Sequence, residues 1–160
     1  MIPFPNKKYS ISNELEFGKL GEHLVCADLI KKGYIAFLTD AGLPYDIICV
    51  INKEIKRIQV KTTLQKTTIG KSFNVYRFGT RHSKGTRQRV NYGDMDYFAF
   101  VAVDINKIGY VKIEEMVLNG KIKTLIEFRD RNIKYNGRIY SNGTIRHRFG
   151  KFIQDYENFP

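Results

Sequence analysis

The stretch LPYDIICVINKEIKRIQVKTT, residues 43–63, has two apolar runs on either side of the polar turn NKE. This pattern predicts a β-hairpin with strands at residues 46–51 and 55–63. The hairpin also carries polar side chains that a core hairpin does not require. An aspartate stands where the first strand begins, and a glutamine and a lysine alternate with apolar residues on the second strand: Asp46, Gln59 and Lys61.

Strand alternation and pairing are expected to bring these three side chains together. Successive side chains point to opposite faces of a strand, so Gln59 and Lys61 share a face. A turn centred on Lys53–Glu54 would pair Asp46 with Lys61, and the Cβ atoms of paired residues lie about 5 Å apart. We therefore expect one polar patch at the open end of the hairpin. A register shift of one residue would separate Asp46 from Gln59 and Lys61. The alternative is that these side chains face water and form only a cross-strand ion pair.

The preceding stretch SISNELEFGKLGEHLVCADLIKKGY, residues 10–34, predicts a long helix that starts at Ser12 or Asn13 and ends at Gly33. At about 100° per residue, the residues within about 80° of Glu22 are mostly apolar. They are Leu15, Val25, Cys26, Leu29 and Ile30. A carboxylate on such a face is costly to bury without a partner, and a lysine or a divalent cation would compensate its charge. Glu22 is therefore a fourth candidate for the patch.

Two carboxylates, a lysine and a main-chain carbonyl near one point suit the hydrolysis of a phosphodiester. The carboxylates of Asp46 and Glu22, with the carbonyl of Val60, are the expected ligands of Mg²⁺, which prefers oxygen. Such an ion acidifies a bound water and neutralises charge on the phosphate. Lys61 can orient the water or stabilise the charge of the transition state. We expect the catalytic residues to be Glu22, Asp46, Gln59 and Lys61.

The rest of the chain predicts a mixed α/β (α+β) fold around one sheet, in a single domain spanning residues 1–160. Further strands are expected at residues 34–39, 72–78, 97–104 and from 109, and a short helix is expected from 114. Beyond about residue 121 the pattern becomes irregular, with Asn-Gly turns at Asn136 and Asn142. Asp94 and Asp96, at the start of the apolar strand YFAFVAVD, are expected to cap the chain rather than to bind metal.

The positive charge is concentrated in two segments, which together account for the whole net charge of +11. Residues 77–92 carry five basic residues and no acid, and residues 129–151 carry seven basic residues and one acid. Concentrated positive charge indicates a polyanionic partner, most simply nucleic acid. The competing interpretation is a solvated basic face. A membrane surface fits less well, because neither segment has the period of an amphipathic helix.

The first basic segment contains a long loop, residues 79–93, that is expected to read DNA. Loops of that length inside a compact domain are often functional, and Arg and Gln make bidentate contacts to guanine and adenine. The second segment, within a basic C-terminal extension at 121–160, is expected to contact DNA or a neighbouring subunit. The predicted DNA-binding residues are Arg77, Arg81, His82, Lys84, Arg87, Gln88, Arg89, Arg146 and Arg148.

Composition limits the cellular setting. No apolar run approaches the roughly 20 residues of a membrane span, and the start MIPFPNKKYS lacks the apolar core of a signal peptide. Cys26 and Cys49 lie in apolar segments without the spacing of metal ligands. They are expected to be reduced core residues, so the protein is expected to be cytoplasmic and without a membrane partner.

The motifs PYD at residues 44–46 and QVK at 59–61, with GE at 21–22, resemble the signature of the PD-(D/E)XK nuclease superfamily. The resemblance covers residues 14 to about 104, the expected catalytic core, and within the family it is strongest to the small cyanobacterial group I intron homing endonucleases. It is expected to extend along the whole chain. It implies a restriction-endonuclease-like core in which helices flank a mixed sheet. It also implies a Mg²⁺-dependent, site-specific DNA endonuclease that acts as a homotetramer.

Gln59 departs from the family pattern, in which an acid normally begins the second motif. An amide carbonyl can bind a metal but brings no charge, which favours one metal ion per site over two. The homing endonucleases that this chain resembles carry the same substitution. Two alternatives remain at this point: a structure-specific nuclease like the Holliday junction resolvases, and a DNA-binding module whose nuclease core is inactive.

Overall fold

The computed structural model describes residues 13–40, 42–69, 73–81, 91–132 and 151–159. Its centre is a five-stranded sheet with the strand order β1-β2-β3-β6-β7. These strands are β1 (Ile35–Leu38), β2 (Ile47–Ile51), β3 (Glu54–Thr63), β6 (Tyr97–Ala102) and β7 (Lys107–Lys112). The pair β3 and β6 is parallel and the other pairs are antiparallel, so the predicted mixed sheet is confirmed.

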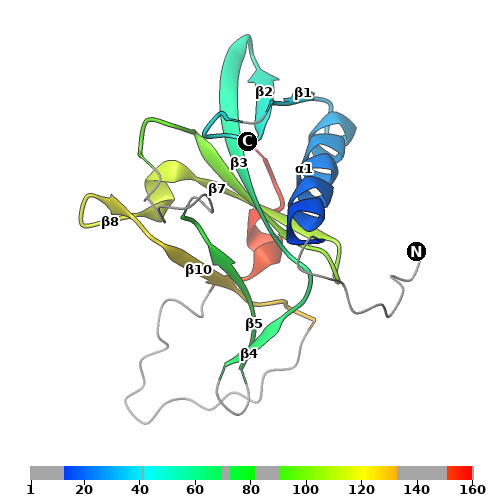
Figure 1. The fold of residues 1–160 in the computed structure, drawn as a ribbon, viewed down its shortest axis with the longest axis vertical. Helices are drawn as coiled ribbons and strands as arrows, with labels where there is room; N and C mark the ends of the chain where they lie inside the picture. The colour runs from blue at the N-terminus through cyan, green and yellow to red at the C-terminus, as the bar shows by residue number, and fades with distance from the viewer. Residues whose placement is uncertain (1–12, 41, 70–72, 82–90, 133–150, 160) are drawn as a thin grey trace.

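One face of this sheet is covered by helix α1 (Asn13–Lys31), the single α-helix of the described residues. The helix ends where the sequence predicts, because Gly33 adopts the positive φ of 91° that favours glycine. Val25 and Leu29 are fully buried against the side chains of Ile47, Cys49 and Ile58. Figure 1 shows α1 alongside the β1–β2–β3 end of the sheet.

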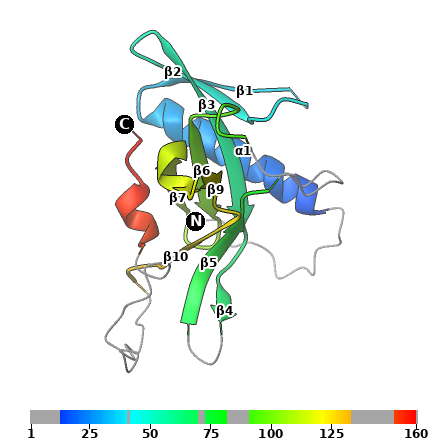
Figure 2. The same cartoon turned by 90° about the vertical axis from the view of Figure 1, so that its left-hand side faces the viewer.

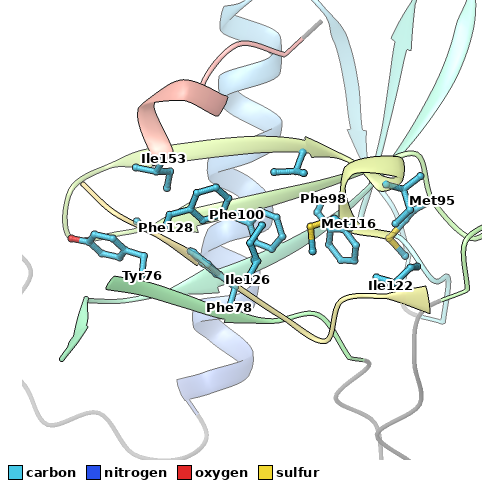
Figure 3. Packing of buried hydrophobic residues seen from close by; sticks show 13 residues of the cluster. Tyr76, Phe78, Met95, Phe98, Phe100, Met116, Ile122, Ile126, Phe128 and Ile153 are labelled. Carbon is cyan, nitrogen blue, oxygen red and sulfur yellow. The ribbon is translucent and has the colours of Figure 1, made fainter. Parts of the chain in front are cut away.

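The opposite face is covered by a second sheet with the order β10-β5-β4. It consists of β4 (Thr67–Ile69), β5 (Phe73–Gly79) and β10 (Leu125–Phe128). Phe98 and Phe100 of β6 pack there against aromatic side chains that include Phe78 and Phe128 (Figure 3). The sequence did not predict β4 or β10, and a small sheet covers the face where the family resemblance implied helices.

Short elements complete the described chain. They are the 3₁₀ helices η1 (Ile113–Met116) and η3 (Ile153–Tyr156) and the two-stranded pair β8 (Val117–Leu118) and β9 (Lys121–Ile122). The helix expected from residue 114 is thus a single 3₁₀ turn that begins one residue earlier. The Asn-Gly turns at Asn136 and Asn142 lie outside the described residues.

Two further expectations are met. Asp96 accepts hydrogen bonds from the backbone and the guanidinium of Arg57, and Asp94 accepts one from the backbone of Asn91, so both acids hold the chain. Both cysteines are free thiols. Within the described residues, no helix combines the length and the apolar character that crossing a membrane requires.

Candidate active site

The β2–β3 hairpin has a tighter turn than the sequence indicated. Asn52 and Lys53 alone form it, with φ values of 50° and 69°, and Ile47 pairs with Ile58. Asp46 therefore lies opposite Gln59, and the predicted pairing of Asp46 with Lys61 is wrong. The register differs by two residues, which preserves the face of every side chain, so Asp46, Gln59 and Lys61 still share one face.

Asp46 is held at the end of β2 by two donors on β3. Its Oδ2 accepts a hydrogen bond of 2.7 Å from the backbone N–H of Val60 and one of 2.5 Å from Nε2 of Gln59. Burial raises the pKa of Asp46; the Val60 N–H opposes that shift, and the Glu22 carboxylate adds to it. Lys61 and Lys19 oppose it further. The negative charge of Asp46 is thus only partly compensated by its neighbours, so a cation beside it would be favourable.

A cleft opens here because β2 and β3 differ in length. Beyond Ile58, β3 continues to Thr63 and pairs only with β6, so its other edge is free. Helix α1 lies along that edge: a Cβ on Gly21 would be 1.8 Å from Oγ1 of Thr62, so only glycine fits. Figure 2 shows β3 running from the hairpin end of the molecule toward β5 and β4.

The cleft has a volume of about 1120 Å³, and the four predicted catalytic residues all line it. Glu22 reaches it from α1 and forms an ion pair of 2.8 Å with Lys19, which sequence reasoning missed although it stands three residues away on the same helix. The side chain of Glu22 is 15% exposed, as expected for a mostly buried carboxylate. The apolar face predicted around it is partly wrong, because Leu15 and Ile30 are 81% and 55% exposed.

Lys61 is half-buried in the same cleft. Burial lowers the pKa of its ammonium, and the carboxylate of Asp46 acts in the opposite direction. Its Nζ donates a hydrogen bond of 3.2 Å to the backbone carbonyl of Arg81. Lys61, a predicted catalytic residue, is therefore tied to Arg81 at the start of the basic loop, a connection that no local sequence signal indicates.

The predicted DNA-binding residues are only partly described. Arg81 is exposed and lines the cleft. Arg77 forms an ion pair of 2.8 Å with the buried Glu127 on β10, so much of its charge is already compensated within the protein. The others lie outside the described residues: His82, Lys84, Arg87, Gln88, Arg89, Arg146 and Arg148.

The donors fit a hard cation better than a soft one. No group of three or more His, Cys, Asp or Glu side chains that could hold a metal occurs among the described residues. Of the three carboxylates that line the cleft, Glu16, Glu22 and Asp46, the pair Glu22 and Asp46 interact electrostatically and could share one cation, with main-chain or water oxygen as further ligands. That donor set suits Mg²⁺, which takes one or two carboxylates and keeps several waters.

Comparison with known proteins finds both a family and solved structures that this chain resembles. A family model described as PD-(D/E)XK endonuclease matches residues 12–141. The solved structure of a bacterial homing endonuclease, I-Ssp6803I, matches with a TM-score of 0.54 and 15% sequence identity, over 74% of this chain and 78% of that chain. No curated protein sequence matches. The expected similarity to a homing endonuclease is thus one of fold, and it is not a close match in sequence along the whole chain.

Proposed function

The chain belongs to the PD-(D/E)XK endonuclease family, as its motifs predicted, and we propose that it is a site-specific DNA endonuclease of the homing type. In this proposal it makes a double-strand break by Mg²⁺-dependent phosphodiester hydrolysis and thereby promotes the mobility of a group I intron. The observation that carries the proposal is the convergence of Glu22, Asp46, Gln59 and Lys61 on one open cleft. We propose that the enzyme works in the cytoplasm, a compartment that suits its two free thiols.

Asp46 and Glu22 are the proposed ligands of the metal ion, together with the carbonyl of Val60. When bound, Mg²⁺ would supply positive charge at the scissile phosphate and acidify a water molecule. The support from this chain is electrostatic: burial and the nearby Glu22 make the negative charge of Asp46 costly, and a cation would remove that cost. Gln59 holds the Asp46 carboxylate in place through its amide N–H.

Lys61 is the proposed catalytic cation of the chain itself. Its half-buried ammonium lies on the same face of β3 as Gln59 and close enough to Asp46 for that carboxylate to stabilise its charge. From this position it orients the attacking water or stabilises the negative charge that develops on the phosphate oxygens. Because Lys61 also donates to the carbonyl of Arg81, DNA bound by the basic loop would lie against the lysine.

The proposed substrate is double-stranded DNA, held by the basic segments. We propose that residues 77–94 read bases and that residues 121–160 contact DNA or a neighbouring subunit, within one nuclease domain. Each chain offers one such centre, so cutting two strands requires at least a dimer. A homotetramer assembled on the DNA target, from free protein in a lower oligomeric state, is proposed by analogy with the homing endonucleases, whose fold this chain shares.

The experiment that tests this function offers the protein two substrates in Mg²⁺: random linear DNA and a synthetic four-way junction. We expect ends that share one sequence, recovered from the linear library by sequencing, and none from the Asp46→Asn variant. Ends clustered at the branch point, without shared sequence, would identify a junction resolvase instead. An intact library with full DNA binding would identify an inactive binding module.

A further inference from the structure

One face of the sheet at its β1–β2–β3 end is apolar and is left open by the described elements. Strand pairing aligns Ile35, Val50 and Ile55 in one row, and Phe37 and Ile48 in the next. The exposed fractions are 58% for Ile35, 59% for Phe37 and 63% for Ile55. The other face of these strands packs under α1. We name these five side chains the apolar hairpin face.

The apolar hairpin face is continuous with the active-site cleft. The same register places Asp46 and Gln59 in the row that follows Phe37 and Ile48, on the same face. Because a strand rises about 3.3 Å per residue, Val50 lies about 13 Å from Asp46 along β2. Whatever covers the apolar hairpin face therefore lies beside the proposed catalytic centre.

The chemistry of this face favours a protein partner over DNA. The basic residue of these rows, Arg57, is held by Asp96 at 3.1 Å and is not available to a phosphate. The adjoining strand β1 is the edge of the sheet, and its sequence IAFL contains none of the charges or prolines by which edge strands usually avoid association. An exposed apolar patch of a few hundred Å² is often functional, even on a monomeric protein.

We propose that the apolar hairpin face is the docking surface for a second copy of this chain, packed face to face across a two-fold axis. The inference rests on the proposed function, because an enzyme that cuts both strands needs a second catalytic centre nearby. The contact is isologous, so both copies contribute the same rows of side chains to it. It places the two clefts on either side of the shared apolar surface.

The exposed area sets the expected strength of the dimer. Three side chains that are more than half exposed and two partly buried ones offer roughly 400 Å² per copy. A standard interface buries about 800 Å² per partner. The free protein is therefore expected to dimerise weakly, at micromolar concentration, and the two copies are expected to be held more tightly when both contact one DNA duplex.

Sedimentation velocity of the full chain over a concentration series tests this surface. Wild type and the control Leu118→Glu are expected to show a concentration-dependent dimer. Leu118 is as exposed as Phe37, at 59%, but it lies on β8, outside the apolar hairpin face. Phe37→Glu and Ile55→Glu are expected to remain monomeric and to melt within a few degrees of wild type. A wild type that stays monomeric at every concentration, or dimeric Phe37→Glu and Ile55→Glu variants, would overturn the proposal.

Cross-linking provides a second measurement that does not depend on weakening the contact. Phe37→Cys treated with a short bismaleimide should form a covalent dimer, because a residue near a two-fold axis lies near its own copy. Leu118→Cys should not. Cys26 and Cys49 are present in both variants, so any reaction of these native thiols contributes equally to each. Equal cross-linking of both variants would contradict the assignment.

Cleavage assays separate this inference from the proposed function. Monomeric Phe37→Glu that nicks one strand of a plasmid in Mg²⁺, while wild type cuts both, supports the two together. A wild type that dimerises through this face but never cuts DNA refutes the nuclease function and leaves the docking surface intact. Unchanged double-strand cutting by a dimeric Phe37→Glu variant refutes the docking surface and leaves the nuclease function intact.

Discussion

At the scale of single residues, Asp46 combines two opposing requirements. Its Oδ2 accepts hydrogen bonds from Val60 and Gln59, which fix its position, yet burial makes its negative charge unfavourable. A residue that is costly to keep charged and is nevertheless held in place is typical of functional sites. The same two donors would also be satisfied by the amide oxygen of an asparagine, which carries no charge.

We therefore predict that Asp46→Asn stabilises the metal-free protein at neutral pH. The pKa of Asp46 is raised on folding, so the folded state binds the proton more tightly, and ionisation above that pKa lowers stability. Without divalent cations the variant should melt a few degrees higher than wild type at neutral pH. The difference should shrink as the pH falls through the raised pKa of Asp46 and should vanish below about 4, where the aspartate becomes protonated in both states. Thermal melts in EDTA across this range would contradict the account if the variant melted lower at neutral pH.

The grouping of the site residues could be predicted from the sequence because side-chain alternation along a strand is strict. Asp46, Gln59 and Lys61 share a face in either register, since the two registers differ by two residues. The surroundings of Glu22 could be predicted only in part, because a helical wheel does not show which part of an apolar arc packs against the sheet. Leu15 and Ile30 lie in that arc and remain exposed.

At the scale of elements, the contact between α1 and β3 sets the width of the cleft. Gly21 lies against Thr62, and Glu22 follows it directly on the helix. The Oγ1 of Thr62 is buried without a hydrogen-bond partner among the described atoms, so its role at this contact is one of shape. The glycine therefore determines how closely the carboxylate of Glu22 approaches β3.

Gly21→Ala should push α1 away from β3 and cost about 1–3 kcal/mol of stability, because overpacking a rigid contact forces the backbone to move. Cleavage in Mg²⁺ should fall with it. Gly18→Ala on the same helix is the matched control: its Cβ would meet nothing within 4 Å, and alanine favours a helix by about 1 kcal/mol. Thr62→Ala should partly restore the Gly21→Ala variant. Identical denaturant midpoints for the two alanine variants would show that the close contact is not real.

The β2–β3 turn makes a second prediction at this scale. A two-residue turn with positive φ at both positions favours Asn-Gly, and this chain has Asn52 and Lys53. Lys53→Gly should therefore raise the free energy of unfolding by roughly 0.5–1 kcal/mol, since it removes a left-handed residue with a Cβ. Urea denaturation measures it. A clear loss of stability would instead favour the longer turn NKE that the sequence indicated.

The elements that sequence reasoning missed are short strands with distant partners. β4 has three residues and β10 has four, and β10 pairs with β5, about fifty residues earlier in the chain. Strand formation depends on such neighbours more than on local preference. The long helix and the buried strand β6 were predictable because each shows its own period or apolar run over many residues.

At the scale of the whole molecule, one cleft is proposed to carry out catalysis and the basic segments are proposed to supply the affinity for DNA. The central sheet separates two hydrophobic clusters, one under α1 and one under the β10-β5-β4 sheet, and the cleft lies where β3 leaves β2. Affinity for DNA rests on many charges spread over the surface, so loss of one catalytic side chain should change binding little.

The most direct test of this central claim compares single-turnover DNA cleavage in Mg²⁺ by wild type, Asp46→Asn, Lys61→Met and the control Lys56→Met. Lys56 is on the same strand but pairs with Glu54 outside the cleft. We predict that Asp46→Asn and Lys61→Met lose at least about 100-fold in rate while binding DNA within about tenfold of wild type. Lys56→Met should cut like wild type. Cleavage at the wild-type rate by either Asp46→Asn or Lys61→Met would contradict the assignment of the active site.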